Sequence, residues 1–198
     1  MNKINLIEIL EENNLNDYSY KFGTDKESHH SYISGFYESA FAKYKDKKIT
    51  ILEIGIYNGG SAALWSRYFT QAKILAVDIH DHIHPSHRNL DRGTYLFGDS
   101  YRPNLFSPEE KFDIIIDDGP HSPLSQVQCI SYYLQHLSSG GIMVIEDIGN
   151  VTVFPILEFF TPQGYRTERI DLRHVKGRED DLMFIIYGSA AQVQGKRI

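Results

Sequence analysis

Short apolar runs alternate with amphipathic segments along most of the chain. Five runs of four to seven residues are rich in aliphatic or aromatic side chains: 49–54, 73–79, 94–97, 112–116 and 141–145. Near-continuous apolar runs of this length are typical of strands that are buried in a parallel sheet. Two later segments, 165–172 and 181–187, complete a predicted sheet of seven strands.

The segments between these strands have apolar residues near helical spacing. Three of them are expected to be helices: 61–69, 123–137 and 153–160. For the second helix, Ser122 is the expected N-cap, Pro123 suits the first turn, and Gly140 follows the end. Alternation of strands and helices predicts an α/β fold, an open and mostly parallel sheet with helices on both faces.

The length of 198 residues fits one α/β domain with a full core and leaves little room for a second. We therefore expect a single domain in three parts. Residues 1–48 would form an N-terminal cap with one or two helices, residues 49–188 the α/β core, and residues 189–198 a frayed tail.

Composition and charge exclude several partners. A net charge of −6 without a Lys/Arg run argues against non-specific nucleic-acid binding. No apolar run approaches the ~18 residues of a membrane span, and residues 1–14 do not resemble a signal peptide. The single cysteine, Cys129, cannot form an internal disulfide and fits a reducing compartment. We expect a cytoplasmic protein with neither nucleic-acid nor membrane partners, and homo-oligomerisation stays open.

The turn after the first predicted strand is rich in glycine. It contains Gly55, Gly59 and Gly60, and Ser61 follows. Glycines let backbone N–H groups approach a ligand closely, and the N-terminus of the next helix favours a carboxylate or phosphate. The spacing G-x-x-x-G-G weakens a dinucleotide interpretation. An ordinary tight turn is an equally good explanation of this feature alone.

Acidic residues end the next two strands. Asp78 follows the glycines by roughly 20 residues, where an acid can accept hydrogen bonds from ribose hydroxyls. Asp99 can accept a hydrogen bond from the exocyclic amine of adenine, and Ser100 can contribute backbone hydrogen bonds. Each acid alone is more often a solvated loop residue, but their common position favours a nucleoside site.

A second group of acids ends the fourth and fifth strands. Asp117 and Asp118 follow one strand, and Glu146 and Asp147 follow the other. Carboxylates that converge need a cation, a proton or an arginine to coexist, and oxygen ligands suit Mg²⁺. We predict Asp118, Glu146 and Asp147 as metal ligands, whereas Asp117 is a helix cap, a loop residue or a cofactor neighbour.

His121 lies three residues after Asp118. Its ordinary pKa near neutrality suits a general base. An alcohol is a poor nucleophile at neutral pH, so a metal that lowers its pKa and a base that takes its proton would act together. We predict His121 and Asp118 as the catalytic residues, with a satisfied loop histidine as the alternative for His121.

The first set of motifs resembles class I methyltransferases. The stretch ILEIGIYNGGS is similar to their S-adenosylmethionine (SAM) binding motif, and Asp78 corresponds to their ribose-binding acid. The resemblance implies a Rossmann-like sheet of order 3-2-1-4-5-7-6 with an antiparallel seventh strand. It also implies that the glycine turn holds the methionine part of SAM. The expected cofactor contacts in these motifs are Glu53, Gly55, Tyr57, Asn58, Gly59, Ser61, Asp78, Asp99, Ser100 and Asp117.

The second set narrows the resemblance. The stretches IIIDDGPH and GGIMVIEDI resemble the macrocin and mycinamicin type of sugar O-methyltransferase and the related cephalosporin hydroxylase family. In both families DDG-x-H and ED carry the metal and the base. The early FGTDK, with the later His30, Ser31 and Tyr32, resembles their G-T-D-K…H-S-Y segment. This implies that Thr24, Lys26 or Tyr32 contacts SAM or substrate, and a helix-entry motif with Ser28 as its cap is an equally good interpretation. Pro120 stands where these families commonly have serine.

The resemblance implies a SAM- and Mg²⁺-dependent O-methyltransferase that acts on a hydroxyl of a sugar or glycan. Small molecules with catechol-like hydroxyls offer the same chelate to a metal and stay an alternative. A hydroxylase is disfavoured, since an iron site normally needs two histidines and a carboxylate. A non-catalytic binding module is a third alternative, because fold does not fix function.

Two polar segments are not predicted to be sites. The loop that contains His80, His82, His84 and His87 has irregular spacing and is interrupted by Pro85, so a zinc site is not expected there. These histidines are expected at the rim of the pocket instead. Residues 173–178 are expected to form a solvated loop between the last two strands, with a contribution to the acceptor site as the alternative.

Overall fold

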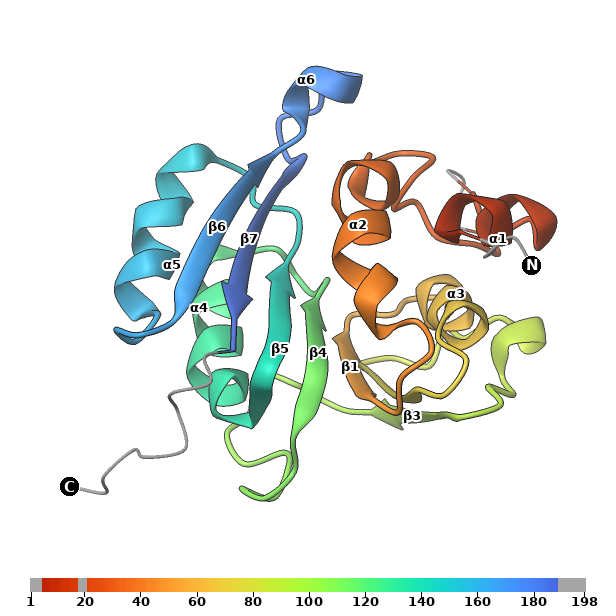
Figure 1. Ribbon diagram of the computed structural model, residues 1–198, viewed down its shortest axis with the longest axis horizontal. Helices are drawn as coiled ribbons and strands as arrows, with labels where there is room; N and C mark the ends of the chain where they lie inside the picture. The colour runs from red at the N-terminus through yellow and green to blue at the C-terminus, as the bar shows by residue number, and fades with distance from the viewer. Residues whose placement is uncertain (1–4, 18–20, 189–198) are drawn as a thin grey trace.

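A seven-stranded sheet forms the centre of the protein (Figure 1), as seen in a computed structural model that describes residues 5–17 and 21–188. The strand order is β3-β2-β1-β4-β5-β7-β6. The first five strands are parallel, and β7 runs antiparallel to both of its neighbours. The strands are β1 (Thr50–Ile54), β2 (Lys73–Asp78), β3 (Gly93–Phe97), β4 (Phe112–Asp117), β5 (Leu137–Ile145), β6 (Arg166–Asp171) and β7 (Leu182–Tyr187). The expected fold class and sheet order are therefore confirmed.

Helices cover both faces of this sheet (Figure 1). On one side lie α1, the short helices that follow it and α3; on the other side lie α4 and α5. The α-helices are α1 (Leu6–Glu12), α2 (Glu38–Phe41), α3 (Gly60–Tyr68), α4 (Pro123–Tyr133), α5 (Phe154–Phe160) and α6 (Arg173–Lys176). A π-helix, η1 (Ile33–Tyr37), precedes α2, and 3-10 turns lie at η2 (Ala42–Tyr44), η3 (Pro85–His87), η4 (Leu134–His136) and η5 (Val151–Val153).

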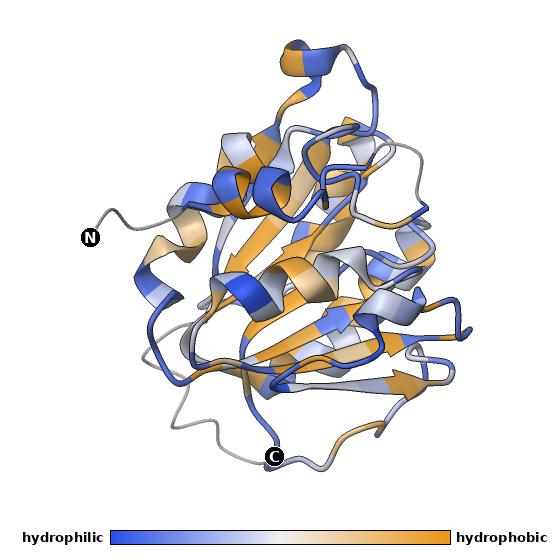
Figure 2. Ribbon diagram, turned by 90° about the vertical axis from the view of Figure 1, so that its right-hand side faces the viewer, coloured by the Kyte–Doolittle hydropathy of each residue, from blue (hydrophilic) through white to orange (hydrophobic). Residues whose placement is uncertain are grey.

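The core follows from the alternation of side chains along each strand. Ile51 points toward the side of α1 and α3 with Ile74 and Ile114 of the neighbouring strands, where Trp65 covers them. Leu52 and its neighbours point to the opposite side, toward α4 and α5. Figure 2 shows that most of the strands are apolar, whereas the helices beside them contain both apolar and polar residues. Burial of each large aliphatic side chain contributes about 1.5–3 kcal/mol, so both layers are needed to hold the strands in register.

The end of the helix expected at residues 123–137 is wrong. The N-cap is as expected, since the side chain of Ser122 accepts a hydrogen bond from the backbone N–H of Ser125. However, α4 ends at Tyr133 and the 3-10 turn η4 continues only to His136, because Leu137 pairs with Phe112 as the first residue of β5. Gly140 lies inside β5 next to a register shift and donates its N–H to the carbonyl of Gly188. Sheet pairing therefore outweighs the local helical pattern.

The N-terminal segment, residues 5–17 and 21–48, reaches the sheet through a close backbone contact. A Cβ atom at Gly60, the first residue of α3, would lie 2.1 Å from the carbonyl oxygen of Gly23. A glycine is therefore required there, and the contact places the residues after Gly23 beside the glycine-rich turn. Leu6 and Leu10 of α1 are buried in the same core. The expected tail, 189–198, lies outside the described residues.

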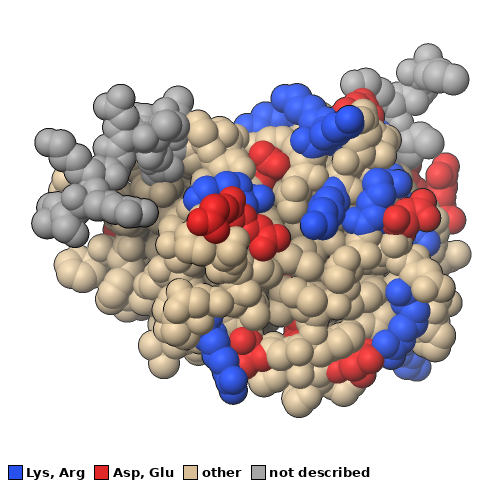
Figure 3. All heavy atoms as spheres, turned by 90° about the horizontal axis from the view of Figure 1, so that it is seen from below, with Lys and Arg blue, Asp and Glu red and all other residues tan. Residues whose placement is uncertain are grey.

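On the face that Figure 3 shows, acidic and basic side chains lie close to one another. Within residues 5–17 and 21–188, no helix has the length and apolar character that would carry it across a membrane.

Candidate active site

A cavity of about 870 Å³ opens at the carboxyl ends of the central strands. This edge is where ligands bind in open α/β sheets. Three groups of residues line the cavity: the glycine-rich turn with the ends of β2 and β3, the loops after β4 and β5, and the segments around residues 23–30 and 178–180. The cavity therefore joins the nucleoside-like motifs to the acidic motifs.

The glycine-rich turn is built around Asp78. Oδ2 of Asp78 accepts hydrogen bonds from the backbone N–H groups of Ile56 (3.0 Å) and Tyr57 (2.9 Å). Gly55 has a φ of +79°, and a Cβ atom there would lie 1.8 Å from the carbonyl oxygen of Asp118. The end of β2 thus fixes the turn after β1, and the missing side chain at Gly55 lets the loop after β4 come close.

The predicted cofactor residues fall into two sets. Thr24, Gly55, Tyr57, Asn58, Ser61, Asp78, Asp99 and Ser100 line the cavity. Glu53, Gly59, Asp117 and Lys26 do not. Glu53 is buried behind the turn, where one oxygen accepts a hydrogen bond from Nε1 of Trp65 (3.0 Å). Burial raises the pKa of Glu53 to about 7, against the opposing charge of Lys26.

Asp117 supports the wall of the cavity from behind. It is buried, and Oδ1 accepts a hydrogen bond from the hydroxyl of Tyr101 (2.5 Å). Burial raises the pKa of Asp117 to about 7. Tyr101 itself lines the cavity and receives a further constraint, because its backbone N–H donates to Oδ1 of Asp99 (2.9 Å).

A buried lysine lies among the acids that end β4 and β5. Nζ of Lys26 lies 2.7 Å from Oδ2 of Asp118 and also contacts Oε2 of Glu146. The Lys26 side chain is only 1% exposed. Burial opposes its charge, but the carboxylates of Asp118 and Glu146 raise its pKa well above the ordinary value. Converging carboxylates need a cation, and here Lys26 supplies one.

Glu146 lies behind the cavity wall, unlike the other two predicted metal ligands, Asp118 and Asp147. Its Oε1 accepts a hydrogen bond from the hydroxyl of Tyr37, and its Oε2 contacts Lys26. Glu146 is buried and does not line the cavity, whereas Asp118 and Asp147 do. The structure thus brings the three acids into one cluster but directs only two of them toward the cavity.

His121 lies between those two acids. Nε2 is 3.3 Å from Oδ1 of Asp118, and Nδ1 is 3.3 Å from Oδ2 of Asp147. Burial opposes protonation, but the hydrogen bond and charge of Asp118, together with Asp147 and Glu146, raise the pKa of His121 to about 9. His121 and Asp147 both have positive φ angles, 57° and 51°. Such strain is concentrated at functional positions.

These three residues fit a divalent cation. Asp118, His121 and Asp147 can each direct one ligand atom to within 4.8 Å of the others. Although burial opposes ionisation, the charge of Lys26 and the hydrogen bond of His121 lower the pKa of Asp118 to about 2. Carboxylate oxygens, with at most one imidazole, form a donor set that Mg²⁺ or Mn²⁺ accepts.

Several residues beside the cavity, on the side of the N-terminal segment, have no role that was predicted from sequence. Nδ1 of His30 lies 2.6 Å from Oδ1 of Asp181, and Nε2 lies 3.4 Å from Oδ2 of Asp25. Burial opposes protonation, but these acids and Asp147 raise the pKa of His30 to about 9. The only available signal for His30 was its place in the G-T-D-K…H-S-Y resemblance.

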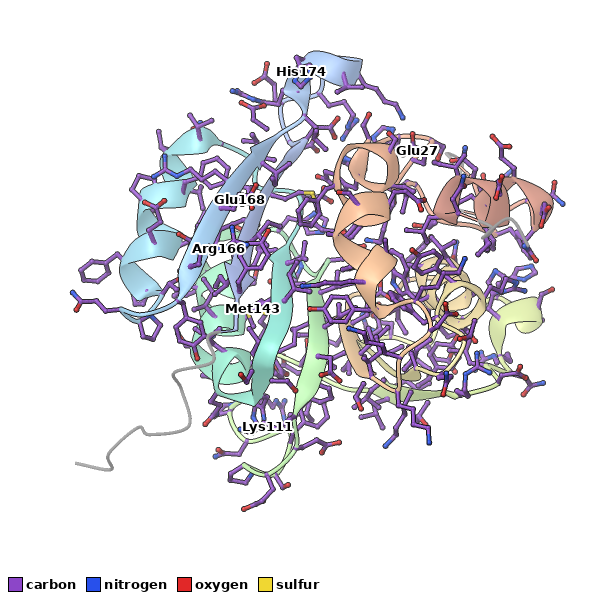
Figure 4. The ribbon with its side chains drawn as sticks, in the orientation of Figure 1. Glu27, Lys111, Met143, Arg166, Glu168 and His174 are labelled. Atoms are coloured by element: carbon purple, nitrogen blue, oxygen red, sulfur yellow. The ribbon has the colours of Figure 1, made fainter. Side chains whose placement is uncertain are left out.

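The segment expected to be a solvated loop between β6 and β7 also contributes to the site. It contains the short helix α6, and Figure 4 shows His174 of this helix and Glu27 on neighbouring segments. Nζ of Lys176 contacts the carbonyl oxygen of Glu27 and lies 2.6 Å from that of His30. Arg178 lines the cavity, so the expectation of a merely solvated loop is wrong.

The histidine loop after β2 packs partly against the N-terminal segment. His87 is buried, and its Nε2 lies 2.6 Å from the carbonyl oxygen of Phe22. His84 accepts a hydrogen bond from the backbone N–H of Ser86. These contacts give both side chains structural roles.

Comparison with known proteins adds the class of protein. Residues 52–148 match a family model described as "Methyltransferase domain". The matched segment contains the glycine-rich turn, the loop after β4 and both acids after β5. The fold, the cavity and this match together indicate a methyltransferase domain.

Within the class, the chain is similar to sugar O-methyltransferases. It is 32% identical over 139 residues to the 8-demethyl-8-alpha-L-rhamnosyl tetracenomycin-C 2'-O-methyltransferase of Streptomyces olivaceus. The alignment covers 65% of this chain and 36% of that protein. It is 30% identical over 145 residues to the demethylmacrocin O-methyltransferase of Streptomyces fradiae. That alignment covers 68% of this chain and 36% of that protein. The chain thus spans about a third of the length of these relatives.

A solved structure agrees with this relationship. The MycE methyltransferase from the mycinamycin biosynthetic pathway, in complex with Mg and SAH, matches with a TM-score of 0.57 and 27% sequence identity. The match covers 73% of this chain and 36% of that chain.

Proposed function

We propose that this chain is a SAM- and Mg²⁺-dependent O-methyltransferase that methylates a hydroxyl group of a sugar or glycan. One observation carries the proposal: a single cavity contains the glycine-rich turn with Asp78 and also the group of Asp118, His121 and Asp147. A methyl donor on one side and an ionising hydroxyl on the other would meet inside it.

The first part of the cavity suits SAM, whose sulfonium makes its methyl group a good electrophile. Asp78 is held by the turn and can accept further hydrogen bonds from ribose hydroxyls. Asp99 lies at the end of β3, where its carboxylate can accept a hydrogen bond from the adenine amine. The N-terminus of α3 and the glycine-rich backbone are suited to the methionine carboxylate.

The second part suits a divalent cation, which Asp118 and Asp147 would hold. When bound, such a cation acts as a Lewis acid that lowers the pKa of an acceptor hydroxyl. Asp118 and Asp147 would then orient the acceptor hydroxyl through the cation that they hold. Asp118 stays ionised throughout the physiological range because its pKa is lowered to about 2.

His121 is the residue that we assign as the base. One of its ring nitrogens would take the hydroxyl proton while the oxygen bonds to the methyl group. The bond between that methyl group and the sulfonium breaks in the same step, and its electron pair stays on the sulfur of the leaving SAH. Without a metal ion, the hydrogen bond and charge of Asp118, with the charges of Asp147 and Glu146, raise the pKa of His121 to about 9, so the ring is mostly protonated at neutral pH. Neutralisation of Asp118 and Asp147 lowers this pKa, so positive charge at the carboxylates favours the basic form of the ring.

The acceptor side of the cavity is polar, which supports a sugar. Asp25, Arg178 and Asp180 line it, and side chains of this kind pair with several hydroxyls at once. Neighbouring hydroxyls of a sugar can also chelate a metal. The relatives named above have rhamnosyl and macrocin-type acceptors in their names, which agrees with this choice.

A methyl-transfer assay with labelled SAM tests the proposal. The purified chain is offered rhamnosides, other deoxyhexosides and a catechol, each with EDTA and with added Mg²⁺. We expect transfer to a glycoside that EDTA abolishes and Mg²⁺ restores, and that Asp118→Asn abolishes too. Full activity in EDTA would remove the metal from the proposal, and transfer to the catechol alone would remove the sugar.

A further inference from the structure

The connection between β6 and β7, residues 172–181, forms one wall of the cavity. Figure 1 shows this connection beyond the end of the sheet, where it contains the short helix α6. Two of its side chains, Arg178 and Asp180, line the same cavity as His121. A few polar groups in the wall of a cavity are what orients and selects a small ligand.

Arg178 and Asp180 form an ion pair at the surface of the cavity. Nη2 of Arg178 lies 2.7 Å from Oδ2 of Asp180, and the two side chains are 26% and 41% exposed. This contact uses one nitrogen and one oxygen, which leaves Nη1 of Arg178 as a donor and Oδ1 of Asp180 as an acceptor for a ligand. A hydroxyl group accepts and also donates a hydrogen bond, so the pair can satisfy one hydroxyl completely.

The pair lies next to the group that we assign as the base. The hydroxyl of Tyr32 lies 2.5 Å from Oδ1 of Asp147 and 3.0 Å from the carbonyl oxygen of Asp180. The other oxygen of Asp147 is 3.3 Å from Nδ1 of His121. An acceptor whose reacting hydroxyl lies beside His121 can therefore reach Asp180 with another hydroxyl of the same sugar.

We propose that Arg178 and Asp180 are specificity-determining residues, which bind a hydroxyl of the acceptor sugar that is not methylated. The inference rests on the proposed function and deepens it, since it describes the acceptor as a neutral sugar with a free hydroxyl in addition to the methylated one. The charges of the pair cancel, and Asp25, Asp118 and Asp147 also line the cavity, so an acidic sugar would be repelled.

The wall is held against the N-terminal segment without an acceptor. Nζ of Lys176 lies 2.6 Å from the carbonyl oxygen of His30, and the backbone N–H of Leu172 donates to the carbonyl oxygen of Asp181 (2.9 Å). Nε of Arg178 lies 3.7 Å from Oδ1 of Asp181, whose side chain is fully buried. A pair that is fixed in this way discriminates between sugars, because an analogue without the hydroxyl leaves its free donor and acceptor without a partner.

Methyl transfer to sugars that each lack one hydroxyl tests the proposal. The acceptors are methyl α-L-rhamnopyranoside and its monodeoxy analogues, and kcat/KM is measured with labelled SAM. With the wild type, we expect at least one analogue that keeps the methylated hydroxyl to lose about tenfold in kcat/KM. In Asp180→Ala, the intact rhamnoside should lose the same factor, whereas that analogue should react as it does with the wild type.

The comparison of variant and analogue separates binding of this hydroxyl from other effects. A hydroxyl that acts elsewhere in the cavity costs the same when it is removed in the wild type and in Asp180→Ala. The variant keeps the backbone carbonyl that Tyr32 contacts, and SAH affinity, measured by calorimetry, should not change. Arg178→Met removes the donor of the pair and should give the same pattern if Asp180→Ala does not fold.

Asp171→Ala is the matched control. Asp171 lies at the end of β6 and forms an exposed pair of the same kind with Arg173 (2.8 Å), but neither residue lines the cavity. This variant should discriminate between the intact rhamnoside and its analogues as the wild type does.

The outcomes separate the two proposals. If the wild type transfers no methyl group to any glycoside, the proposed function fails, and this inference fails with it. If the wild type methylates a glycoside but Asp180→Ala and Arg178→Met both keep its discrimination among the analogues, the inference alone is overturned. Loss of discrimination against one analogue in these variants, without such a loss in Asp171→Ala, supports it.

Discussion

The two halves of the cavity are built in different ways. In the half that suits SAM, the side chain that holds the glycine-rich turn comes from the next strand along the chain: Asp78 and Ile56 are 22 positions apart. In the acidic half, the partners come from the N-terminal segment: Lys26 and Glu146 are 120 positions apart. The cofactor half thus belongs to the sheet itself, whereas the acidic half is complete only when the N-terminal segment is docked on it.

The largest effect that separates the halves is expected from His121→Ala. Loss of a general base lowers turnover by about 10²- to 10⁴-fold, whereas the affinity for SAH should stay at the wild-type value because His121 lies in the acidic half. Methyl-transfer rates and calorimetric SAH binding measure the two. His174→Ala, on exposed α6 (Figure 4), is the histidine control. Equal losses in rate and in SAH affinity would show that His121 is not the base.

The next effect concerns stability. Lys26→Met leaves Asp118 and Glu146 without their counter-charge in a buried place, and removal of one partner of such a pair costs about 3–5 kcal/mol. We expect the free energy of unfolding, measured with urea, to fall by that amount. Lys111→Met, at an exposed position far from the cavity (Figure 4), should change it little. A loss of only about 1 kcal/mol, the value of a surface ion pair, would contradict the role of Lys26 as the buried cation.

A smaller effect is expected in the cofactor half. Asp78→Asn weakens the acceptor for the N–H groups of Ile56 and Tyr57 and removes a charge that faces the ribose. The expected loss of SAH affinity is about 1–3 kcal/mol, or roughly tenfold to a hundredfold. The exposed Asp91 provides the control Asp91→Asn. SAH affinity that is the same in both variants would argue against Asp78 as a cofactor residue.

The smallest expected effect is a shift in the titration of His121. In the protein without metal, its pKa of about 9 means that the ring is protonated below that pH and becomes a base above it. Mg²⁺ and Asp147→Asn each remove negative charge next to the ring, so each should lower this pKa, by about one unit. Histidine NMR measures it, with His174 as the internal reference. A pKa unaffected by Mg²⁺ would place the cation elsewhere.

The two halves of the cavity also differ in how much of each could be predicted from sequence. The strand order followed from the resemblance and was confirmed, and the acids at strand ends pointed to the correct edge of the sheet. Those signals are local, since each depends on one apolar run and the residues that follow it. The boundary at Leu137 failed because pairing with Phe112 competes with a helical pattern, and a local pattern contains no information about pairing.

The internal arrangement of the acidic half could not be predicted in the same way. The sequence indicated that clustered carboxylates need a cation, but it did not show that Lys26 would enter from 92 positions away to contact Asp118. It also could not show that Glu146 would be engaged by Tyr37, or that His30 would meet Asp181. These contacts depend on how the N-terminal segment packs over the sheet.

The central claim is that Asp118 and Asp147, next to His121, hold the cation, while Lys26 keeps Glu146 apart from it. Crystals of the chain with SAH and Mn²⁺, measured at the manganese absorption edge, test this most directly. We expect one anomalous peak within bonding distance of Oδ1 of Asp118 and Oδ2 of Asp147, with Lys26 still in contact with Glu146. A peak bonded to Glu146 with Lys26 displaced, or no peak in the cavity, would contradict it.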